Sequence, residues 1–208
     1  MTRPGRASVA YLAVGALSLP VLKLYRTRWQ GVENVPRSGG AVVASNHLSN
    51  FDPWPLALGL FPQRSFRFMA KIELFRPPLG WILPILGAFP VDRTRSDRAA
   101  LGIAVEACRD GYVLLMFPEG TRRTKGLRKR FAPQAHTGAA RIALRAAVPL
   151  IPAAVKGTDR LSRLEPLRVA YGPPVALDDL AGAGRRRAAE TATERLMEAI
   201  GGLERTLG

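Results

Sequence analysis

Residues 41–53 read AVVASNHLSNFDP, an apolar run that leads through a polar loop into a helix start. The run Ala41–Ser45 follows a Ser-Gly-Gly turn and is typical of a buried strand. Asp52 and Pro53 are typical of a helix start, with aspartate as the cap and proline at the first helical position. The stretch therefore predicts a strand–loop–helix unit in which His47 lies at the end of the strand.

His47 and Asp52 are five positions apart, and their chemistry depends on the loop between them. In a continuous helix these positions would lie on different faces, whereas a strand–loop–helix junction can fold the carboxylate back onto the imidazole. A carboxylate in that place fixes the ring tautomer and stabilises the imidazolium that forms during proton transfer. We interpret His47 as a candidate general base and Asp52 as its orienting carboxylate, with a purely structural histidine as the alternative.

The rest of the chain alternates between short apolar runs and helical periodicity. The apolar runs predict strands at Phe66–Met69, Gly87–Val91, Tyr112–Phe117, Leu150–Val155 and Arg168–Tyr171. The periodic segments predict helices at Ser96–Arg109, Gly138–Ala147 and Arg185–Leu207. This alternation indicates an α/β class: a single-domain layered fold with a central, mostly parallel or mixed sheet flanked by helices.

The N-terminal segment from Ala7 to Leu22 is uncharged and has basic residues on both sides. It lacks a small-residue cleavage site, which disfavours a signal peptide. At about 1.5 Å per residue it would extend roughly 24 Å, short of the roughly 30 Å hydrocarbon core, and we expect Pro20 to bend or end the helix. We expect residues 1–28 to form a helix lying in the membrane interface at the cytoplasmic face, monotopic, with residues 29–208 as the catalytic domain. A buried helix of a soluble protein is the alternative.

The net charge of +15 comes from 31 basic and 16 acidic residues, and arginine far outnumbers lysine. Arginine binds phosphate and carboxylate through a planar fork, so nucleic acid, an anionic membrane surface and a phosphorylated substrate all fit the charge. Nucleic acid is not the expected partner, because aromatic content is only 7% and no stacking platform is evident. We expect no metal, because two histidines and one cysteine show no ligand spacing. That cysteine, Cys108, lies on an apolar helical stripe and is interpreted as a core residue.

A second polar segment, residues 117–122, reads FPEGTR and follows the apolar run Tyr112–Met116. Six basic residues then lie between Arg122 and Arg130 without an acidic residue among them. Arg122 could bind a substrate phosphate, with Glu119 positioning it. The other basic residues could face anionic lipid, and a solvated basic loop is the alternative interpretation for most of them.

Taken together, these motifs resemble the glycerophospholipid acyltransferase family, specifically its bacterial 1-acylglycerol-3-phosphate acyltransferase type. The resemblance extends from about Trp29 to Pro174 and includes four ordered motifs. They are Asn46-His47-x4-Asp52, Gly87-Ala88-Phe89-Pro90-Val91-Asp92-Arg93 with the preceding Lys71-x-Glu73-Leu74, Phe117-Pro118-Glu119-Gly120-Thr121-Arg122, and Val148-Pro149-Leu150-Ile151-Pro152.

The resemblance implies an O-acyltransferase in which His47 deprotonates the free hydroxyl of a lysophosphatidate-like acceptor. Asp52 would orient the imidazole of His47. The hydroxyl oxygen then attacks the thioester of acyl-CoA or acyl-carrier protein, without an acyl-enzyme and without a cofactor. The residues implied to bind the acceptor phosphate are Arg93, Glu119, Gly120, Thr121 and Arg122. Further possible acceptor or donor contacts are Asn46, Lys71, His136, Pro149 and Ile151, of which the last two match the motif on the acyl-donor side.

One position departs from the family pattern, which usually has Phe-Lys-x-Gly where this chain has Ala135-His136-Thr137-Gly138. Because the usual lysine is replaced by His136, the resemblance leaves recognition of the phosphate or the donor open. Three alternatives therefore stay open. They are an acyltransferase for glycerol 3-phosphate, another lysophospholipid or a glycolipid; a non-catalytic protein that binds anionic lipid; and a nucleic-acid-binding module.

Overall fold

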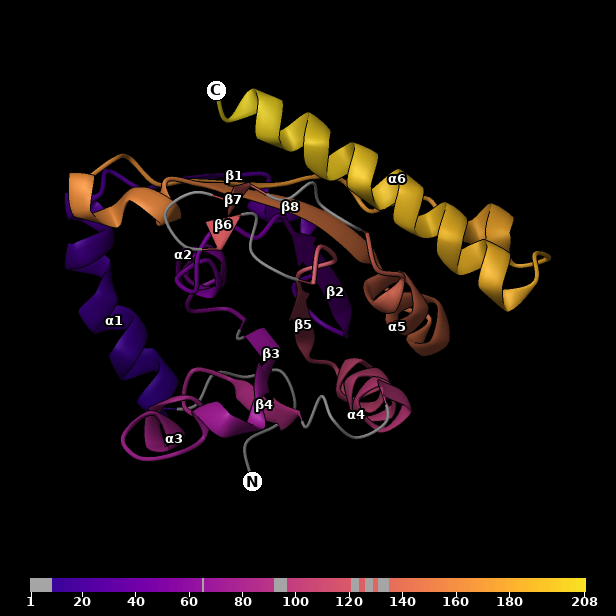
Figure 1. Cartoon of the computed structure of the whole chain (residues 1–208), viewed down its shortest axis with the longest axis horizontal. Coiled ribbons are helices and arrows are strands. Elements are labelled where there is room, and N and C mark those ends of the chain that lie inside the picture. Colours follow the sequence, from indigo (N-terminus) through magenta and orange to yellow (C-terminus); the bar gives the residue numbers. More distant parts are fainter. Residues whose placement is uncertain (1–8, 65, 92–96, 121–123, 126–128, 131–134) are drawn as a thin grey trace.

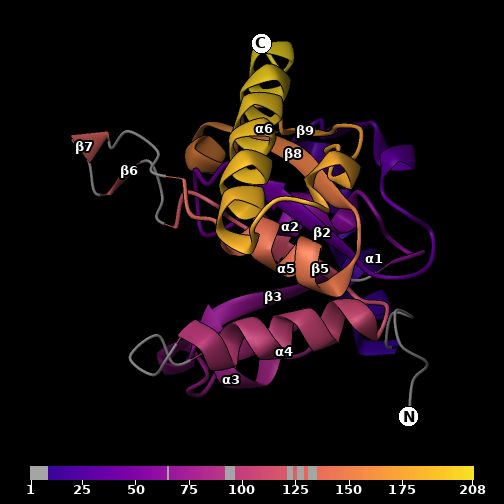
Figure 2. The same cartoon turned by 90° about the vertical axis from the view of Figure 1, so that its right-hand side faces the viewer.

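A seven-stranded sheet forms the centre of the protein in the computed structural model, which describes residues 9–64, 66–91, 97–120, 124–125, 129–130 and 135–208 (Figure 1). The strand order is β1-β9-β8-β2-β5-β3-β4. The strands are β1 (Arg28–Gln30), β2 (Ala41–Ser45), β3 (Phe66–Lys71), β4 (Ala88–Val91), β5 (Val113–Met116), β8 (Leu150–Lys156) and β9 (Arg168–Tyr171). A separate antiparallel pair, β6 (Thr124–Lys125) and β7 (Lys129–Arg130), projects from the body of the protein (Figure 2).

Five neighbouring strands, β8-β2-β5-β3-β4, run parallel, and β9 pairs antiparallel with β8. In the centre, Ala44 is paired with Met116 of β5 and with Pro152 of β8. Parallel strands end at the same edge of a sheet, so this register places the carboxyl ends of β8, β2 and β5 side by side. The predicted α/β class with a mostly parallel, mixed sheet is confirmed.

Helices cover both faces of the sheet. They are α1 (Val9–Leu24), α2 (Pro53–Leu58), α3 (Leu79–Ile82), α4 (Asp97–Arg109), α5 (Gly138–Ala146) and α6 (Arg185–Thr206). Short 3₁₀ helices occur at η1 (Val32–Asn34), η2 (Ile72–Leu74), η3 (Thr158–Arg163) and η4 (Asp178–Leu180). Figure 1 shows α1 and α2 on one side of the sheet and α4, α5 and α6 on the other.

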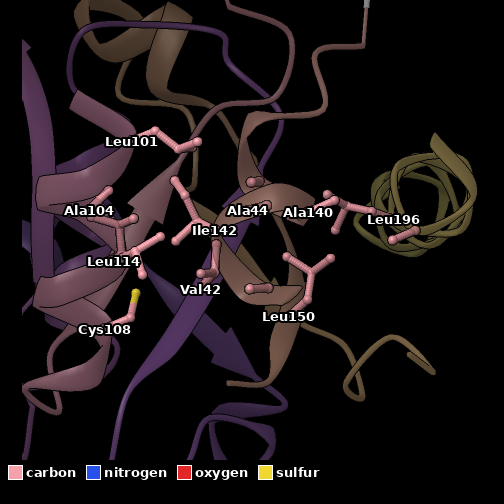
Figure 3. Close-up of a cluster of buried hydrophobic side chains, with 14 of the residues drawn as sticks. Val42, Ala44, Leu101, Ala104, Cys108, Leu114, Ala140, Ile142, Leu150 and Leu196 are labelled. Atoms are coloured by element: carbon pink, nitrogen blue, oxygen red, sulfur yellow. The ribbon is translucent and has the colours of Figure 1, made fainter. Parts of the chain in front are cut away.

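Alternating residues of β2 supply the two layers of the core. Val42 and Ala44 belong to a buried cluster with residues of α4, α5 and α6, including Ile142 and Leu196 (Figure 3). Ala41, Val43 and Ser45 point to the opposite face, where Val43 clusters with side chains from the α2 side. Every β2 residue is buried, as expected for a central strand covered on both faces.

The predicted strands and helices agree with the observed ones to within a few residues at each end. The sequence analysis missed β1, the β6–β7 pair and α3, which are short and carry no periodic pattern. Of the two outcomes expected at Pro20, a bend or an end, the end is excluded, because α1 continues to Leu24. The expected cap was wrong, since Asp52 precedes α2 without making a side-chain capping bond. Ser96, the first residue of the helix predicted at Ser96–Arg109, lies outside the described residues.

The N-terminal helix α1 packs on the domain by one face. Its Leu22 is buried in a cluster with Leu58 and Leu167, and the hydroxyl of Tyr11 approaches the carbonyl of Ala57. Several apolar residues on its other face are exposed, among them Val9, Leu17 and Leu24. Within the described residues, no helix combines the length and the apolar character needed to cross a bilayer.

Cys108 lies on α4 inside the cluster shown in Figure 3, with 1% of its surface exposed. Its interpretation as a core residue is confirmed. Burial raises the pKa of its thiol to about 12, because the thiolate would lose its hydration in the apolar core.

Cys108 should therefore resist alkylation while the protein is folded, because the thiolate is the reactive species. Iodoacetamide treatment at about pH 8, followed by mass spectrometry, should show one added group only after guanidinium chloride has unfolded the protein. The Cys108→Ser variant is the control for reaction at other side chains. Rapid labelling of the folded protein would contradict the buried position.

Candidate active site

The candidate site lies at the carboxyl edge of the sheet, where β2 ends at Ser45 and the loop 46–52 leads to α2. Its neighbours β5 and β8 end at the same edge, at Met116 and Lys156. The residues that follow these three strands therefore meet around the loop. This is the edge of an open α/β sheet at which ligands usually bind.

Asp52 is fully buried and accepts four hydrogen bonds from described residues. Its Oδ2 accepts from Nδ1 of His47 at 2.7 Å, from the backbone N–H of Leu48 at 2.7 Å and from that of Ser49 at 2.9 Å. Its Oδ1 accepts from the hydroxyl of Thr158 at 2.5 Å. The carboxylate thus folds back over its own loop and does not cap α2.

His47 lies between that buried carboxylate and the surface, with 18% of its side chain exposed. Phe117 stacks on the imidazole, with ring centroids 4.1 Å apart and an interplanar angle of 20°. Because Nδ1 donates to the Asp52 carboxylate, the neutral ring has its lone pair on Nε2. The geometry therefore gives His47 the tautomer that a general base requires, as the sequence analysis expected from the loop.

Asn46 holds the loop to the neighbouring strand β8. Its Oδ1 accepts from the N–H of Val155 at 2.8 Å and from the hydroxyl of Ser45 at 3.0 Å. Its Nδ2 donates to the carbonyl of Val155 at 2.9 Å and to the carboxylate of Glu204 at 2.8 Å. These bonds use all four of its hydrogen-bonding positions, so the observed role is structural. A substrate contact of Asn46 stays a prediction.

The turn after β5 lies beside His47, because Phe117 begins it. The N–H of Gly120 donates to the carbonyl of Phe117 at 3.0 Å, and Glu119 within the turn is 97% buried, with 3% of its surface exposed. Gly120 has φ +68°, which favours glycine, and a Cβ there would lie 2.7 Å from Cδ2 of His136, so the two residues are in close contact. The structure therefore brings Glu119, Gly120 and His136 together, next to the His47–Phe117 stack.

The remaining predicted site residues do not all lie at this edge of the sheet. Lys71 ends β3 at the same sheet edge as His47, and β3 pairs parallel with β5. Arg93, Thr121 and Arg122 lie outside the described residues. Pro149 and Ile151 are not brought to this edge.

Ile151 lies near the start of β8, and Pro149 directly precedes the strand. The carbonyl of Pro149 accepts from the N–H of Val42, near the amino end of β2, and Ile151 is fully buried in register with Val43. The two residues therefore lie toward the opposite edge of the sheet from His47. Their contact with an acyl donor stays a prediction that this placement does not favour.

Thr158 is the site residue that the sequence analysis missed. It follows β8 directly after Gly157, and no pattern in the sequence distinguishes it from any other threonine after a strand. The signal that identifies it, a hydrogen bond to a residue 106 positions away, exists only in the folded chain.

The fold and the site together place a histidine, held by a buried carboxylate, at the carboxyl edge of an α/β sheet, an arrangement typical of enzymes that use a general base. The acyltransferase family model matches residues 26–156, and because this is more than half of the chain, the protein belongs to the acyltransferase family. The resemblance inferred from the four motifs is thus confirmed at the level of the family.

Individual relatives are named for one type of acyltransferase. A chloroplast 1-acyl-sn-glycerol-3-phosphate acyltransferase of Brassica napus is 34% identical over 149 residues, which cover 69% of this chain and 41% of that protein. The chain thus spans less than half the length of this relative. The 1-acyl-sn-glycerol-3-phosphate acyltransferase of Bacillus subtilis is 30% identical over 179 residues, or 84% of this chain and 86% of that protein.

A solved structure shares the fold. The crystal structure of the 1-acyl-sn-glycerophosphate acyltransferase from Thermotoga maritima superposes with a TM-score of 0.68 and 25% sequence identity. The match covers 93% of this chain and 79% of that one, so the sheet and its flanking helices are similar almost throughout.

Replacing His47 with alanine should lower the rate of acyl transfer at least about 100-fold, because the acceptor hydroxyl loses its base. The fold should be retained, since Asp52 keeps its bonds to Leu48, Ser49 and Thr158. Steady-state rates of thiol release, beside thermal melting curves of both proteins, measure the two effects. Turnover close to that of the wild type would refute the general-base assignment.

Proposed function

We propose that the protein transfers a fatty acyl group from an acyl thioester to the free hydroxyl of a lysophosphatidate-like acceptor, giving phosphatidate. The observation that carries the proposal is the His47–Asp52 pair, joined at 2.7 Å beside the Phe117–Gly120 turn in a chain of the acyltransferase family. The names of the Brassica napus, Bacillus subtilis and Thermotoga maritima relatives support this choice of acceptor.

The proton transfers follow from the tautomer of His47. Nε2 takes the proton of the acceptor hydroxyl while the hydroxyl oxygen attacks the thioester carbonyl and forms the new C–O bond. The tetrahedral intermediate then collapses, the C–S bond breaks, and the imidazolium returns its proton to the leaving thiolate. Asp52 stabilises the imidazolium between the two transfers, and the stacked Phe117 ring limits rotation of the imidazole.

This sequence of steps needs no acyl-enzyme and no cofactor. The acyl group comes from a co-substrate, acyl-CoA or acyl-carrier protein, and passes directly to the acceptor oxygen. Cys108, the one cysteine of the chain, is buried in the core, and its thiol is not accessible to a substrate as a nucleophile would have to be.

The acceptor phosphate is proposed to bind at the sheet edge next to His47. Arg93 comes two positions after the last residue of β4 in the sequence, and Arg122 two positions after Gly120; the resemblance assigns both to the acceptor phosphate. Glu119, Gly120 and Thr121 would complete the site. His136 lies against Gly120 where the family usually has lysine, and this position favours a difference in head-group recognition as the alternative function.

Exposed apolar surface supports docking to a membrane. Besides the outer face of α1, a second apolar surface is formed by η2, α3 and the residues after it; its exposed members are Ile72, Leu74, Leu79, Trp81, Ile82 and Ile85. Single exposed apolar side chains are ordinary, but six of them within residues 72–85 are typical of an interaction surface. With a net charge of +15, an anionic bilayer at the cytoplasmic face is the partner that we propose.

Replacing Arg122 with alanine should chiefly raise the KM for lysophosphatidate, with a smaller change in the KM for the acyl donor, because the guanidinium is proposed to bind the acceptor phosphate. We expect a rise of roughly tenfold or more, the usual effect of a lost bond to a charged group. Arg186→Ala, on the exposed start of α6, is a matched loss of charge and should change neither constant. A selective loss of donor affinity would show that the phosphate assignment is wrong.

Replacing Trp81 with glutamate should weaken binding to vesicles that contain phosphatidylglycerol, because the indole is 72% exposed on the proposed docking surface. Ile103→Glu is the matched control: Ile103 is also an exposed apolar residue, but it lies on α4, outside the α3 surface. Co-sedimentation at increasing lipid concentration measures both variants. Equal losses in the two variants would indicate an effect of charge alone.

A further inference from the structure

Thr158 is a buried threonine whose hydroxyl is directed at the candidate catalytic pair. Only 2% of its surface is exposed, and its hydroxyl donates to Oδ1 of Asp52 at 2.5 Å. Gly157, with φ +92°, turns the chain sharply at the end of β8, and a Cβ there would lie 2.8 Å from the carbonyl oxygen of Pro166. The glycine turn thus places Thr158 directly behind the loop 46–52.

This arrangement differs from the usual use of a buried threonine. Thr193 of α6 is also buried, but its hydroxyl bonds to the carbonyl of Ala189, four residues earlier in the same helix. Such a bond satisfies the hydroxyl locally. The hydroxyl of Thr158 instead joins two separate elements, η3 and the loop before α2, through a carboxylate.

The two oxygens of Asp52 have different partners. Oδ2 accepts from His47 and from two backbone N–H groups, whereas Thr158 is the donor that the described residues supply to Oδ1. Rotation about the Cβ–Cγ bond moves both carboxylate oxygens together, so the donors on Oδ1 and Oδ2 jointly hold the carboxylate plane. The donor on Oδ1 also satisfies a charge that has lost its water, and without it the buried carboxylate would be favoured to rotate toward other donors.

We propose that Thr158 is a positioning residue of the reaction: its hydroxyl sets the plane of the Asp52 carboxylate and thereby holds His47 in the orientation of a general base. The change in kcat that this proposal expects rests on the proposed function. Thr158 does not touch the reacting atoms, and its effect passes through Asp52 to the imidazole.

Three variants test the proposal. Thr158→Val keeps the shape and removes the hydroxyl, Thr158→Ser keeps the hydroxyl, and Thr193→Val makes the same change at a buried position within α6. We expect Thr158→Val to lower kcat by roughly 10- to 100-fold, the range for a lost bond to a charged group, with the KM of both substrates unchanged. Thr158→Ser and Thr193→Val should have kcat values close to that of the wild type.

A spectroscopic readout separates this proposal from the proposed function. The Nδ1–H proton of His47, hydrogen-bonded to a carboxylate, should give a low-field NMR signal, which is assigned by its absence in His47→Ala. We expect the signal in the wild type, in Thr158→Ser and in Thr193→Val. In Thr158→Val the Nδ1–H proton should exchange rapidly with water and its signal should be lost, because the carboxylate no longer holds one orientation.

The outcomes are distinct. Unchanged kcat or an unchanged signal in Thr158→Val would overturn the positioning role, whatever the substrate. Should the valine variant fail to fold, a large fall of kcat in the folded Thr158→Ser protein would overturn it as well, because the hydroxyl is still present. If the wild type transfers no acyl group to lysophosphatidate while the signals follow the expected pattern, the proposed function fails and the link from Thr158 to His47 stands.

Discussion

The carboxylate of Asp52 has no exposed surface, and an ionised group in such a place must have its charge satisfied by the protein. Four donors do so: His47, the N–H groups of Leu48 and Ser49, and the hydroxyl of Thr158. They come from the loop that follows β2 and from the turn that follows β8. Forming the site therefore requires the two strands to end together, and this requirement ties the catalytic chemistry to the register of the sheet.

The register meets this requirement because β8, β2 and β5 are parallel neighbours. On one side, β8 delivers Thr158 to the carboxylate; on the other, β5 delivers Phe117 to the face of the His47 ring. Asn46 extends the pairing beyond the last strand residue by bonding both backbone groups of Val155. Its further bond to Glu204 connects the loop to the last turns of α6, so the C-terminal helix helps to support the site.

Much of this organisation could be predicted because its signals are local. Alternation of apolar runs with helical periodicity predicted the α/β class, and the run before Asn46 predicted β2 with its bounds. The strand–loop–helix junction predicted that Asp52 folds back onto His47. Short elements without a period, such as α3, were missed, and α1 continues past Pro20 to Leu24, with Leu22 packed against the domain.

The sequence by itself thus determined the fold class, the pairing of His47 with Asp52, and the family, since each depends on neighbouring residues or on ordered motifs. Only the tertiary structure decided which distant residues complete the site. It brought Thr158 to Asp52 and His136 to Gly120, and it left Ile151 in the core, toward the opposite edge of the sheet. The reason is physical: these contacts depend on strand order and register, and neither is encoded in the spacing along the chain.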